Sequence, residues 1–302
     1  MLDIEPYFSK KCGFDLGKIL VKPGQTASLA RDFDPDYTGD YKDKAEAEGI
    51  LRSNIELLME RQDILYANAS QSLLLIFQAM DAAGKDSTIK HVMSGVNPQG
   101  CQVSSFKAPA GEELRHDYLW RAVRRLPEHG SIGIFNRSYY EEVLVVRVHP
   151  ELLASQHLSP KDAGPHLWKR RFEDINNFER YLTHNGTLVL KFFLNVSRKE
   201  QKKRFLKRIE QQEKNWKFSA SDIRERQFWD KYMISYEEAF SHTSTPGTPW
   251  FVVPADHKWF TRLCVSQIIV ATLKALCLKY PKPTKEQLEE LEKAKQELLK
   301  ED

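Results

Sequence analysis

A short stretch of the chain combines residue types that bind phosphate at the start of a helix. It runs Gln78-Ala79-Met80-Asp81-Ala82-Ala83-Gly84-Lys85-Asp86-Ser87-Thr88, after an apolar run and before a helical pattern. Backbone N–H groups at a helix N-terminus bind phosphate oxygens, aided by the helix dipole, and Lys85 adds a mobile positive charge. The common pattern G-x-x-x-x-G-K-[ST] is met incompletely, because Ala79 stands for the first glycine and Asp86 for the hydroxyl residue. The alternative is an ordinary strand-to-helix turn with an exposed lysine. The predicted phosphate-binding residues are Ala82, Ala83, Gly84, Lys85, Asp86, Ser87 and Thr88.

Asp81 lies inside this loop, where a further anion beside phosphate would be unfavourable. A divalent cation removes the conflict, because it binds a carboxylate and phosphate oxygens together. We therefore expect Asp81 to hold Mg²⁺, or Mn²⁺ in its place. The alternative is that Asp81 only caps a turn.

A second polar group follows another predicted strand, in the run Phe135-Asn136-Arg137-Ser138-Tyr139-Tyr140-Glu141-Glu142. Ligands of parallel sheets bind at the carboxyl ends of the strands, so these side chains are expected near the loop. Arg137 is suited to hold a phosphoryl group with two parallel hydrogen bonds. The plainer interpretation is that Ser138 caps a helix and the two glutamates favour its N-terminus.

A third candidate is the basic run from Arg198 to Arg208, in which seven of eleven residues are lysine or arginine. Arg204 and Arg208 are one helical turn apart, as are Lys203 and Lys207. A lone run of charge usually forms a solvated helix face. After a strand, in a protein with a phosphate loop, it favours a lid that closes over the reacting group.

Apolar runs that alternate with helical patterns must position these groups. Strands are predicted at 72–79, 101–106, 131–135, 187–194 and 250–253. Helices are predicted at 42–68, 85–94, 112–126, 139–148, 166–184, 197–216, 221–240, 259–278 and 285–300. This alternation predicts an α/β fold with a central parallel sheet and helices on both faces. Residues 1–302 are expected to form one domain, with an N-terminal arm at 1–40, a lid at about 197–225 and a C-terminal helix at 284–302.

The composition excludes several classes of protein. The 302 residues include 45 basic and 42 acidic ones, so the net charge of +3 gives little support to a nucleic-acid-binding module. The four cysteines contain no C-x-x-C pair, which indicates reduced thiols. Neither a membrane-spanning stretch nor a signal peptide is predicted, so we expect a cytoplasmic protein without membrane partners.

Together the motifs resemble those of the polyphosphate kinase 2 family. The resemblance rests on Phe77–Asp86, on Phe135–Glu141 and on the basic run. It extends over nearly the whole chain through further motifs at Gly95–Gly100, Phe106–Pro109, His116–Arg121 and Pro254–Trp259.

The resemblance implies a P-loop kinase fold similar to that of thymidylate kinase, with three αβα layers. It implies Mg²⁺-dependent phosphoryl transfer between inorganic polyphosphate and nucleotides. Asn136 and the following Tyr139-Tyr140-Glu141 are similar to class III, whose members phosphorylate both nucleoside mono- and diphosphates. Where other classes carry aspartate this chain carries Asn136, which leaves the second metal ligand open. The resemblance also implies a homo-oligomer, a dimer or a tetramer.

The expected reaction needs no strong base, because the acceptor phosphate of AMP or ADP is already anionic. Catalysis then consists of positioning and charge neutralisation. The predicted catalytic residues are Asp81, Lys85, Arg137, Arg204 and Arg208. The predicted polyphosphate contacts are Lys90, Lys107, Arg121, Lys203 and Lys207, and the predicted nucleotide contacts are Asn136, Glu141, Glu142 and Asp117.

Two other interpretations remain. An ATP-dependent nucleoside or nucleotide kinase of the thymidylate-kinase type would share the fold, the loop and the lid. A binding module for RNA or DNA with a degenerate phosphate loop is the second, and no nucleic-acid motif supports it. The expected ligands are therefore inorganic polyphosphate and nucleoside mono-, di- and triphosphates, with no nucleic acid.

Overall fold

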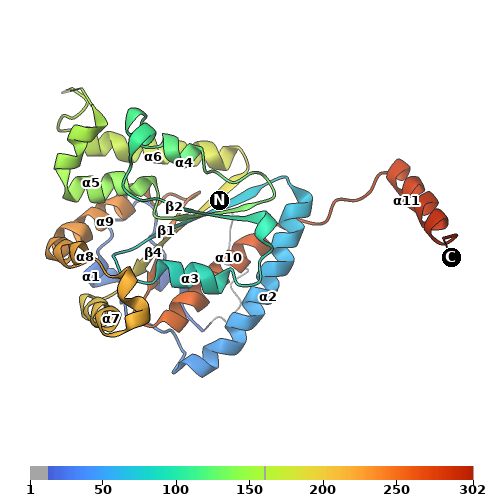
Figure 1. The fold of residues 1–302 in the computed structure, drawn as a ribbon, viewed down its shortest axis with the longest axis horizontal. Coiled ribbons are helices and arrows are strands. Elements are labelled where there is room, and N and C mark those ends of the chain that lie inside the picture. Colours follow the sequence, from blue (N-terminus) through green and yellow to red (C-terminus); the bar gives the residue numbers. More distant parts are fainter. Residues whose placement is uncertain (1–12, 160, 302) are drawn as a thin grey trace.

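A parallel five-stranded sheet forms the centre of the molecule (Figure 1). The computed structural model describes residues 13–159 and 161–301. The spatial order of the strands is β2-β3-β1-β4-β5, and every neighbouring pair is parallel. The strands are β1 (Ser72–Gln78), β2 (Cys101–Ser105), β3 (Ile132–Asn136), β4 (Thr187–Asn195) and β5 (Trp250–Pro254). Because the chain leaves β1 for one side of the sheet and later returns to the other, the carboxyl ends of β1, β3 and β4 define a binding crevice.

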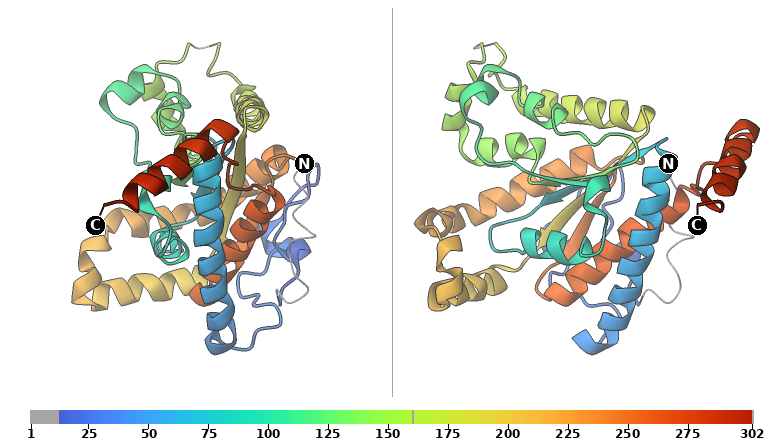
Figure 2. Two further views of the ribbon diagram at one scale, coloured as in Figure 1. Left: turned by 90° about the vertical axis from the view of Figure 1, so that its right-hand side faces the viewer. Right: turned by 45° about the vertical axis from the view of Figure 1, so that its right-hand side comes forward.

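Helices cover both faces of the sheet and make three αβα layers, as predicted (Figures 1 and 2). One face carries α2 (Lys44–Asn68), α3 (Lys85–Val92) and α10 (Lys258–Ala275). The other face carries α5 (Val145–Val148), α6 (Leu167–His184) and α9 (Trp229–Thr243). Every residue of β1 and of β5 is buried, because each strand has helices on both sides.

The described part of the N-terminal arm, from Gly13, packs along the outer edge of the sheet. It includes α1 (Leu29–Asp32). The Val21 amide donates to the Trp250 carbonyl at 2.9 Å, and the Val252 amide donates to the Ile19 carbonyl at 2.7 Å. Ile19 and Val21 are buried, so the arm covers the free edge of β5. Residues 1–12 of the predicted arm lie outside the described residues.

The helix predicted at 112–126 is wrong. The segment forms a 3₁₀ turn at Gly111–Arg115 and a single helical turn, α4 (Trp120–Val123). Between them Asp117 accepts a hydrogen bond from the Leu119 amide at 2.9 Å through its side chain. A side chain that binds the backbone in this way starts a new turn and competes with a continuous helix.

Two further predicted helices are also broken. The segment 139–148 forms a 3₁₀ turn at Tyr139–Val143 followed by α5. The segment 221–240 is divided into α8 (Ala220–Glu225), a 3₁₀ turn at Arg226–Phe228 and α9. At this second break the Arg226 guanidinium donates to the Arg198 carbonyl at 3.2 Å, so a tertiary contact accompanies the bend.

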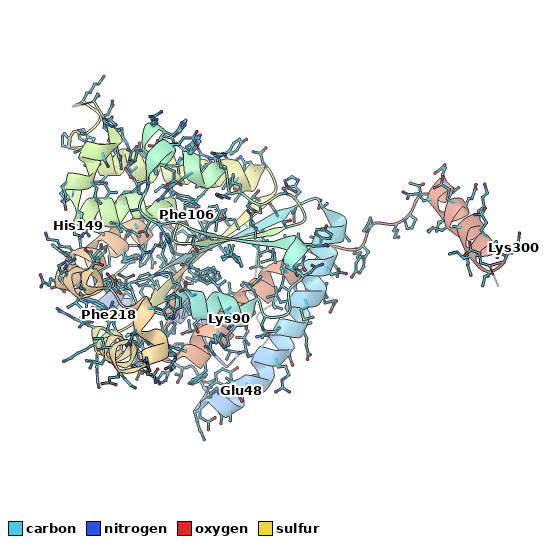
Figure 3. All side chains as sticks on the ribbon, viewed as in Figure 1. Glu48, Lys90, Phe106, His149, Phe218 and Lys300 are labelled. Carbon is cyan, nitrogen blue, oxygen red and sulfur yellow. The ribbon has the colours of Figure 1, made fainter. Side chains whose placement is uncertain are left out.

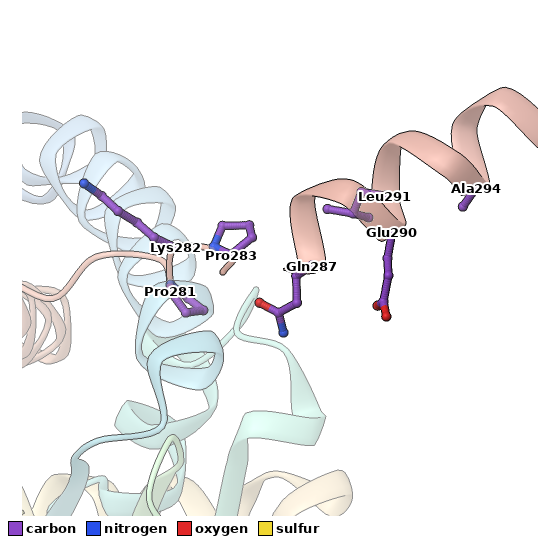
Figure 4. Close-up of a pocket in the computed structure, with 7 residues that line it drawn as sticks. All are labelled: Pro281, Lys282, Pro283, Gln287, Glu290, Leu291 and Ala294. Atoms are coloured by element: carbon purple, nitrogen blue, oxygen red, sulfur yellow. The ribbon is translucent and has the colours of Figure 1, made fainter. Parts of the chain in front are cut away.

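The predicted lid packs against this body, and the C-terminal helix projects from it (Figure 1). The basic run forms α7 (Arg198–Glu210), and α8 follows it after a 3₁₀ turn at Gln212–Lys217. The last helix, α11 (Lys285–Leu298), stands away from the body after Pro281 and Pro283 (Figures 1 and 4). Figure 3 shows the separation, with Lys90 on the body and Lys300 at the far end of the chain. No helix of the described residues is long and apolar enough to cross a membrane.

Candidate active site

The predicted phosphate loop connects β1 to the N-terminus of α3. Gly84 precedes the helix with a φ of +113°, a value that side chains rarely adopt, so glycine is needed there. Ala82 has a φ of +61°, which is uncommon for a residue with a side chain. The Thr88 amide donates to the Gly84 carbonyl at 2.9 Å, so the helix begins directly after the loop. The first amides of α3 therefore point towards the carboxyl end of β1.

Lys85 extends back along the loop, and its Nζ donates to the Ala79 carbonyl at 2.9 Å. Burial and the nearby charge of Arg137 lower the pKa of Lys85 to about 8. A phosphate oxygen would replace this carbonyl as an acceptor and favour the charged lysine. The structure thus places the Lys85 amine beside the loop, and its contact with phosphate stays a prediction.

Arg137 and Asp81 meet at the end of the crevice. Arg137 Nη2 donates to Asp81 Oδ1 at 2.9 Å, and its Nη1 lies 3.3 Å from Glu141 Oε2. Arg137 has a φ of +63°, an uncommon conformation for a large side chain. Such conformations cluster at functional sites, where the surrounding structure enforces them. The two predicted groups, from β1 and β3, are therefore brought together as expected.

The prediction that Arg204 reaches the transferring group is wrong in this structure. Its guanidinium is buried and donates to the carbonyls of Ala82 and Ala83 in the loop, at 3.2 and 2.6 Å. It also donates to the carbonyls of Ala255 and Asp256 after β5, at 2.5 and 3.1 Å. Because these contacts turn the loop carbonyls towards Arg204, they leave the opposite side of the loop to its amide donors. Arg204 is a support of the phosphate loop.

Arg208, one turn further along α7, is only partly buried. Its Nη1 lies 3.8 Å from Asp222 Oδ2 on α8, and its guanidinium packs over Phe205. Burial and the nearby carboxylate of Asp81 raise the pKa of Asp222. The influence of Asp81 on this pKa indicates that Asp222 lies near the loop. A catalytic role of Arg208 stays a prediction.

Several predicted substrate contacts are engaged elsewhere. Asn136 donates to Asp86 Oδ1 at 2.6 Å, within the site. Glu142 was expected to face the nucleotide, but it is buried and accepts a hydrogen bond from Arg171 at 2.9 Å. That expectation is wrong because a carboxylate enclosed in this way has no open side, and burial raises its pKa.

The predicted polyphosphate contacts also divide into two groups. Arg121 Nη1 donates to the Lys107 carbonyl at 2.6 Å, and only 11% of the Arg121 side chain is exposed. In this conformation Arg121 therefore holds its own loop, contrary to the prediction. The side chains of Lys90, Lys107, Lys203 and Lys207 are exposed. Asp117, predicted to contact nucleotide, is exposed and caps the turn described above.

A comparison with protein families decides the identity of this arrangement. The family model described as "Polyphosphate kinase 2 (PPK2)" matches residues 40–280. The chain belongs to the polyphosphate kinase 2 family. It is a phosphotransferase with a P-loop kinase fold, and the motifs that define its site lie within the matched residues.

Curated proteins and a solved structure agree with this membership. The chain is 53% identical over 261 residues to an "ADP-polyphosphate phosphotransferase" of Rhodopseudomonas palustris, covering 86% of this chain and 90% of the relative. It is 43% identical over 270 residues to an "AMP/ADP-polyphosphate phosphotransferase" of Meiothermus ruber, covering 88% and 96%. The crystal structure of polyphosphate kinase 2 from Arthrobacter aurescens TC1 matches with a TM-score of 0.79 and 41% identity, covering 87% of this chain and 90% of that one.

The donors at the polyphosphate kinase site are compatible with Mg²⁺. In kinase sites this ion takes one or two carboxylates and completes its shell with phosphate oxygens and water. Asp81 offers a partly exposed carboxylate beside the loop, and Asp86 offers another where the common pattern has a hydroxyl. Among the described residues no group of three or more His, Cys, Asp or Glu side chains is placed to enclose a metal. A site shared with phosphate fits these donors better than a cage made by protein alone.

Sequence reasoning missed two residues that contact the loop. Gln201 is buried and donates to the Asp81 carbonyl at 2.9 Å. Arg262 on α10 donates to Ser87 Oγ at 2.9 Å. Gln201, Arg204 and Phe205 have the spacing of one helix face and are all buried. Because two of the three are polar, helix periodicity did not indicate this buried face within the basic run.

Proposed function

We propose that this polyphosphate kinase transfers the terminal phosphoryl group of inorganic polyphosphate to AMP and ADP, reversibly. The observation that carries the proposal is the convergence of Lys85, Asp81 and Arg137 at the helix N-terminus that follows β1. The names of the relatives from R. palustris and M. ruber support the choice of donor and acceptors.

The charges of the site suit a reaction between two anionic substrates. In the structure Arg137 is neutralised by Asp81 and Glu141. When phosphates enter, they compete for the Arg137 guanidinium, and Mg²⁺ held by Asp81 would supply further positive charge. Arg137 and Lys85 then stabilise the charge on the transferring group, and the amides of the loop fix its position.

Exposed lysines near the phosphate loop are suited to bind the polyphosphate chain that donates the phosphoryl group. We propose Lys203 and Lys207 on α7, with Lys90 on α3 and Lys107 after β2, as contacts for polyphosphate. The Lys203 side chain is 80% exposed, so its amine is available to a bound polyanion. Many weak contacts of this kind give an affinity that falls as salt rises, by analogy with nucleic acids.

Further properties belong to the same proposal. We expect a cytoplasmic homo-oligomer that requires Mg²⁺, accepts Mn²⁺ and does not bind nucleic acid. The leucines of α11 support self-association, because Leu288, Leu291 and Leu298 are each more than half exposed. Sedimentation of the full chain, compared with a chain that ends before Lys285, tests this point.

Purified protein with Mg²⁺ and long-chain polyphosphate tests the reaction, with AMP and ADP offered separately. ATP formed from ADP supports the donor assignment, and ADP formed from AMP supports the class III assignment. The AMP arm matters because the relative from R. palustris is named for ADP and the relative from M. ruber for both nucleotides. Lys85→Ala is the matched inactive control. Product formed only with ATP as the donor would move the assignment to an ATP-dependent kinase.

A further inference from the structure

A fully buried ion pair lies on the inner side of the turn Tyr139–Val143, which follows Arg137. Lys191 on β4 and Glu179 on α6 have no exposed surface, and Lys191 Nζ lies 2.6 Å from Glu179 Oε2. Lys191 also donates to the Thr243 carbonyl at 2.7 Å, and Thr248 donates to Glu179 Oε2 at 2.8 Å. The reaction described above does not use these groups.

Two tyrosines connect this ion pair to the site. The hydroxyls of Tyr139 and Tyr140 each donate to Glu179 Oε1 at 2.8 Å. The Tyr140 hydroxyl also accepts a hydrogen bond from Lys191 Nζ at 3.0 Å. Both rings are buried, so the whole 3₁₀ turn that begins at Tyr139 is fixed from below.

The sequence places the tyrosines between the two residues that face the loop. Arg137 precedes the pair, Glu141 follows it, and these two side chains are 3.3 Å apart in the site. Ser138, also buried, accepts hydrogen bonds from the Tyr140 amide and from Gln78 at the end of β1. Three consecutive inward-facing residues, Ser138, Tyr139 and Tyr140, thus lie between the two charged residues Arg137 and Glu141.

We propose that the buried cluster of Lys191, Glu179, Tyr139 and Tyr140 is a positioning device that holds Arg137 and Glu141 against the phosphate loop. Arg137 adopts a left-handed φ of +63°, a conformation that persists only where its surroundings enforce it. Its own amide donates to the Phe77 carbonyl at 2.9 Å, which fixes one side of the residue. The tyrosines fix the other side.

The chemistry of the cluster favours positioning over stability. Replacing a buried ion pair by apolar residues is often neutral for stability, so a buried pair is weak evidence for a role in folding alone. The hydrogen bonds of the cluster are directional, however, and they determine the position and the orientation of the 3₁₀ turn that carries the two tyrosines. A small displacement of a group that acts on the transition state lowers turnover strongly.

A double-mutant cycle between the tyrosines and Arg137 tests the inference, which rests on the proposed function. Tyr139→Phe combined with Tyr140→Phe removes both hydroxyls and leaves Glu179 paired with Lys191 and Thr248. We expect kcat to fall between about tenfold and a hundredfold, with KM changed less than about twofold. In an Arg137→Ala background the same pair should lower kcat by less than about twofold. An equal loss in both backgrounds, or no loss in a folded variant, would overturn the proposal.

Tyr181→Phe is the matched control, because Tyr181 lies on α6 with Glu179 but is 63% exposed, and its kcat should be unchanged. If the double variant does not fold, Tyr139→Phe alone enters the cycle. A crystal structure of the variant gives a readout independent of activity. We expect Arg137 Nη2 to leave Asp81 Oδ1, 2.9 Å away here, and an unchanged contact would contradict the inference. Wild-type protein without polyphosphate-dependent activity would instead refute the proposed function, and the crystallographic test would still stand.

Discussion

Replacing Arg204 by alanine separates two roles that a lid arginine can have. If Arg204 acted only on the transferring phosphoryl group, Arg204→Ala would lower turnover and leave stability unchanged. The structure instead gives its guanidinium four backbone carbonyls, two in the phosphate loop and two after β5. We therefore expect Arg204→Ala to lower both stability and turnover.

The expected loss of stability follows from these contacts. A net contribution of about 1 kcal/mol for each of the four hydrogen bonds gives about 4 kcal/mol in the free energy of unfolding. The further bond to Glu200 adds less, because Glu200 still has the Lys203 amine 3.7 Å away when the arginine is removed. For a chain of 302 residues the loss corresponds to roughly 6 °C in Tm.

Urea denaturation followed by tryptophan fluorescence measures this loss, and initial rates with polyphosphate and ADP measure turnover. Lys203→Ala is the control, since the neighbouring Lys203 side chain is 80% exposed and its removal should change the free energy of unfolding by less than about 0.5 kcal/mol. An Arg204→Ala protein as stable as the wild type, but with little turnover, would refute the supporting role and return Arg204 to the reacting group.

Three further predictions concern the charges of the site. Lys85, whose pKa is lowered to about 8, loses its proton as the pH rises through that value, so KM for polyphosphate should rise between pH 7 and 9. Kinetic pH profiles check this, and Lys85→Arg should flatten the profile because a guanidinium stays charged. Asp81→Asn should lower kcat at least about a hundredfold and abolish its dependence on Mg²⁺, measured by metal titration after chelation. A variant that responds normally to Mg²⁺ would exclude Asp81 as its ligand. Lys203→Glu with Lys207→Glu should raise KM for long polyphosphate about tenfold and flatten the plot of log KM against log salt. An equal rise in KM for tripolyphosphate would argue against binding of a long polyphosphate chain along these lysines.

Local sequence patterns predicted the sheet well. The apolar runs at 72–79, 131–135 and 187–194 became β1, β3 and β4 with small changes at their ends. Strands of a parallel sheet are buried on both faces and therefore have continuous apolar sequences. The apolar composition of these runs was sufficient to predict them as strands. The predictions of continuous helices at 112–126 and 221–240 were wrong. Asp117 and Arg226 make contacts at the breaks that the spacing of apolar residues does not indicate.

The sequence by itself predicted a phosphate loop after β1 and placed Arg137 near it, and the structure brings Arg137 and Asp81 of this loop together. Gly84, Lys85 and the residues after β3 act through local backbone geometry and through the rule that parallel strands end at one edge. Only the tertiary structure decided which charges face substrate. Arg204 and Lys203 are adjacent in a basic run, yet one is buried against the loop and the other is exposed, because α7 packs one face onto the loop. The partner of Glu179 is likewise a lysine on β4 that no local pattern indicates, since burial and pairing are set by contacts between elements distant in the chain.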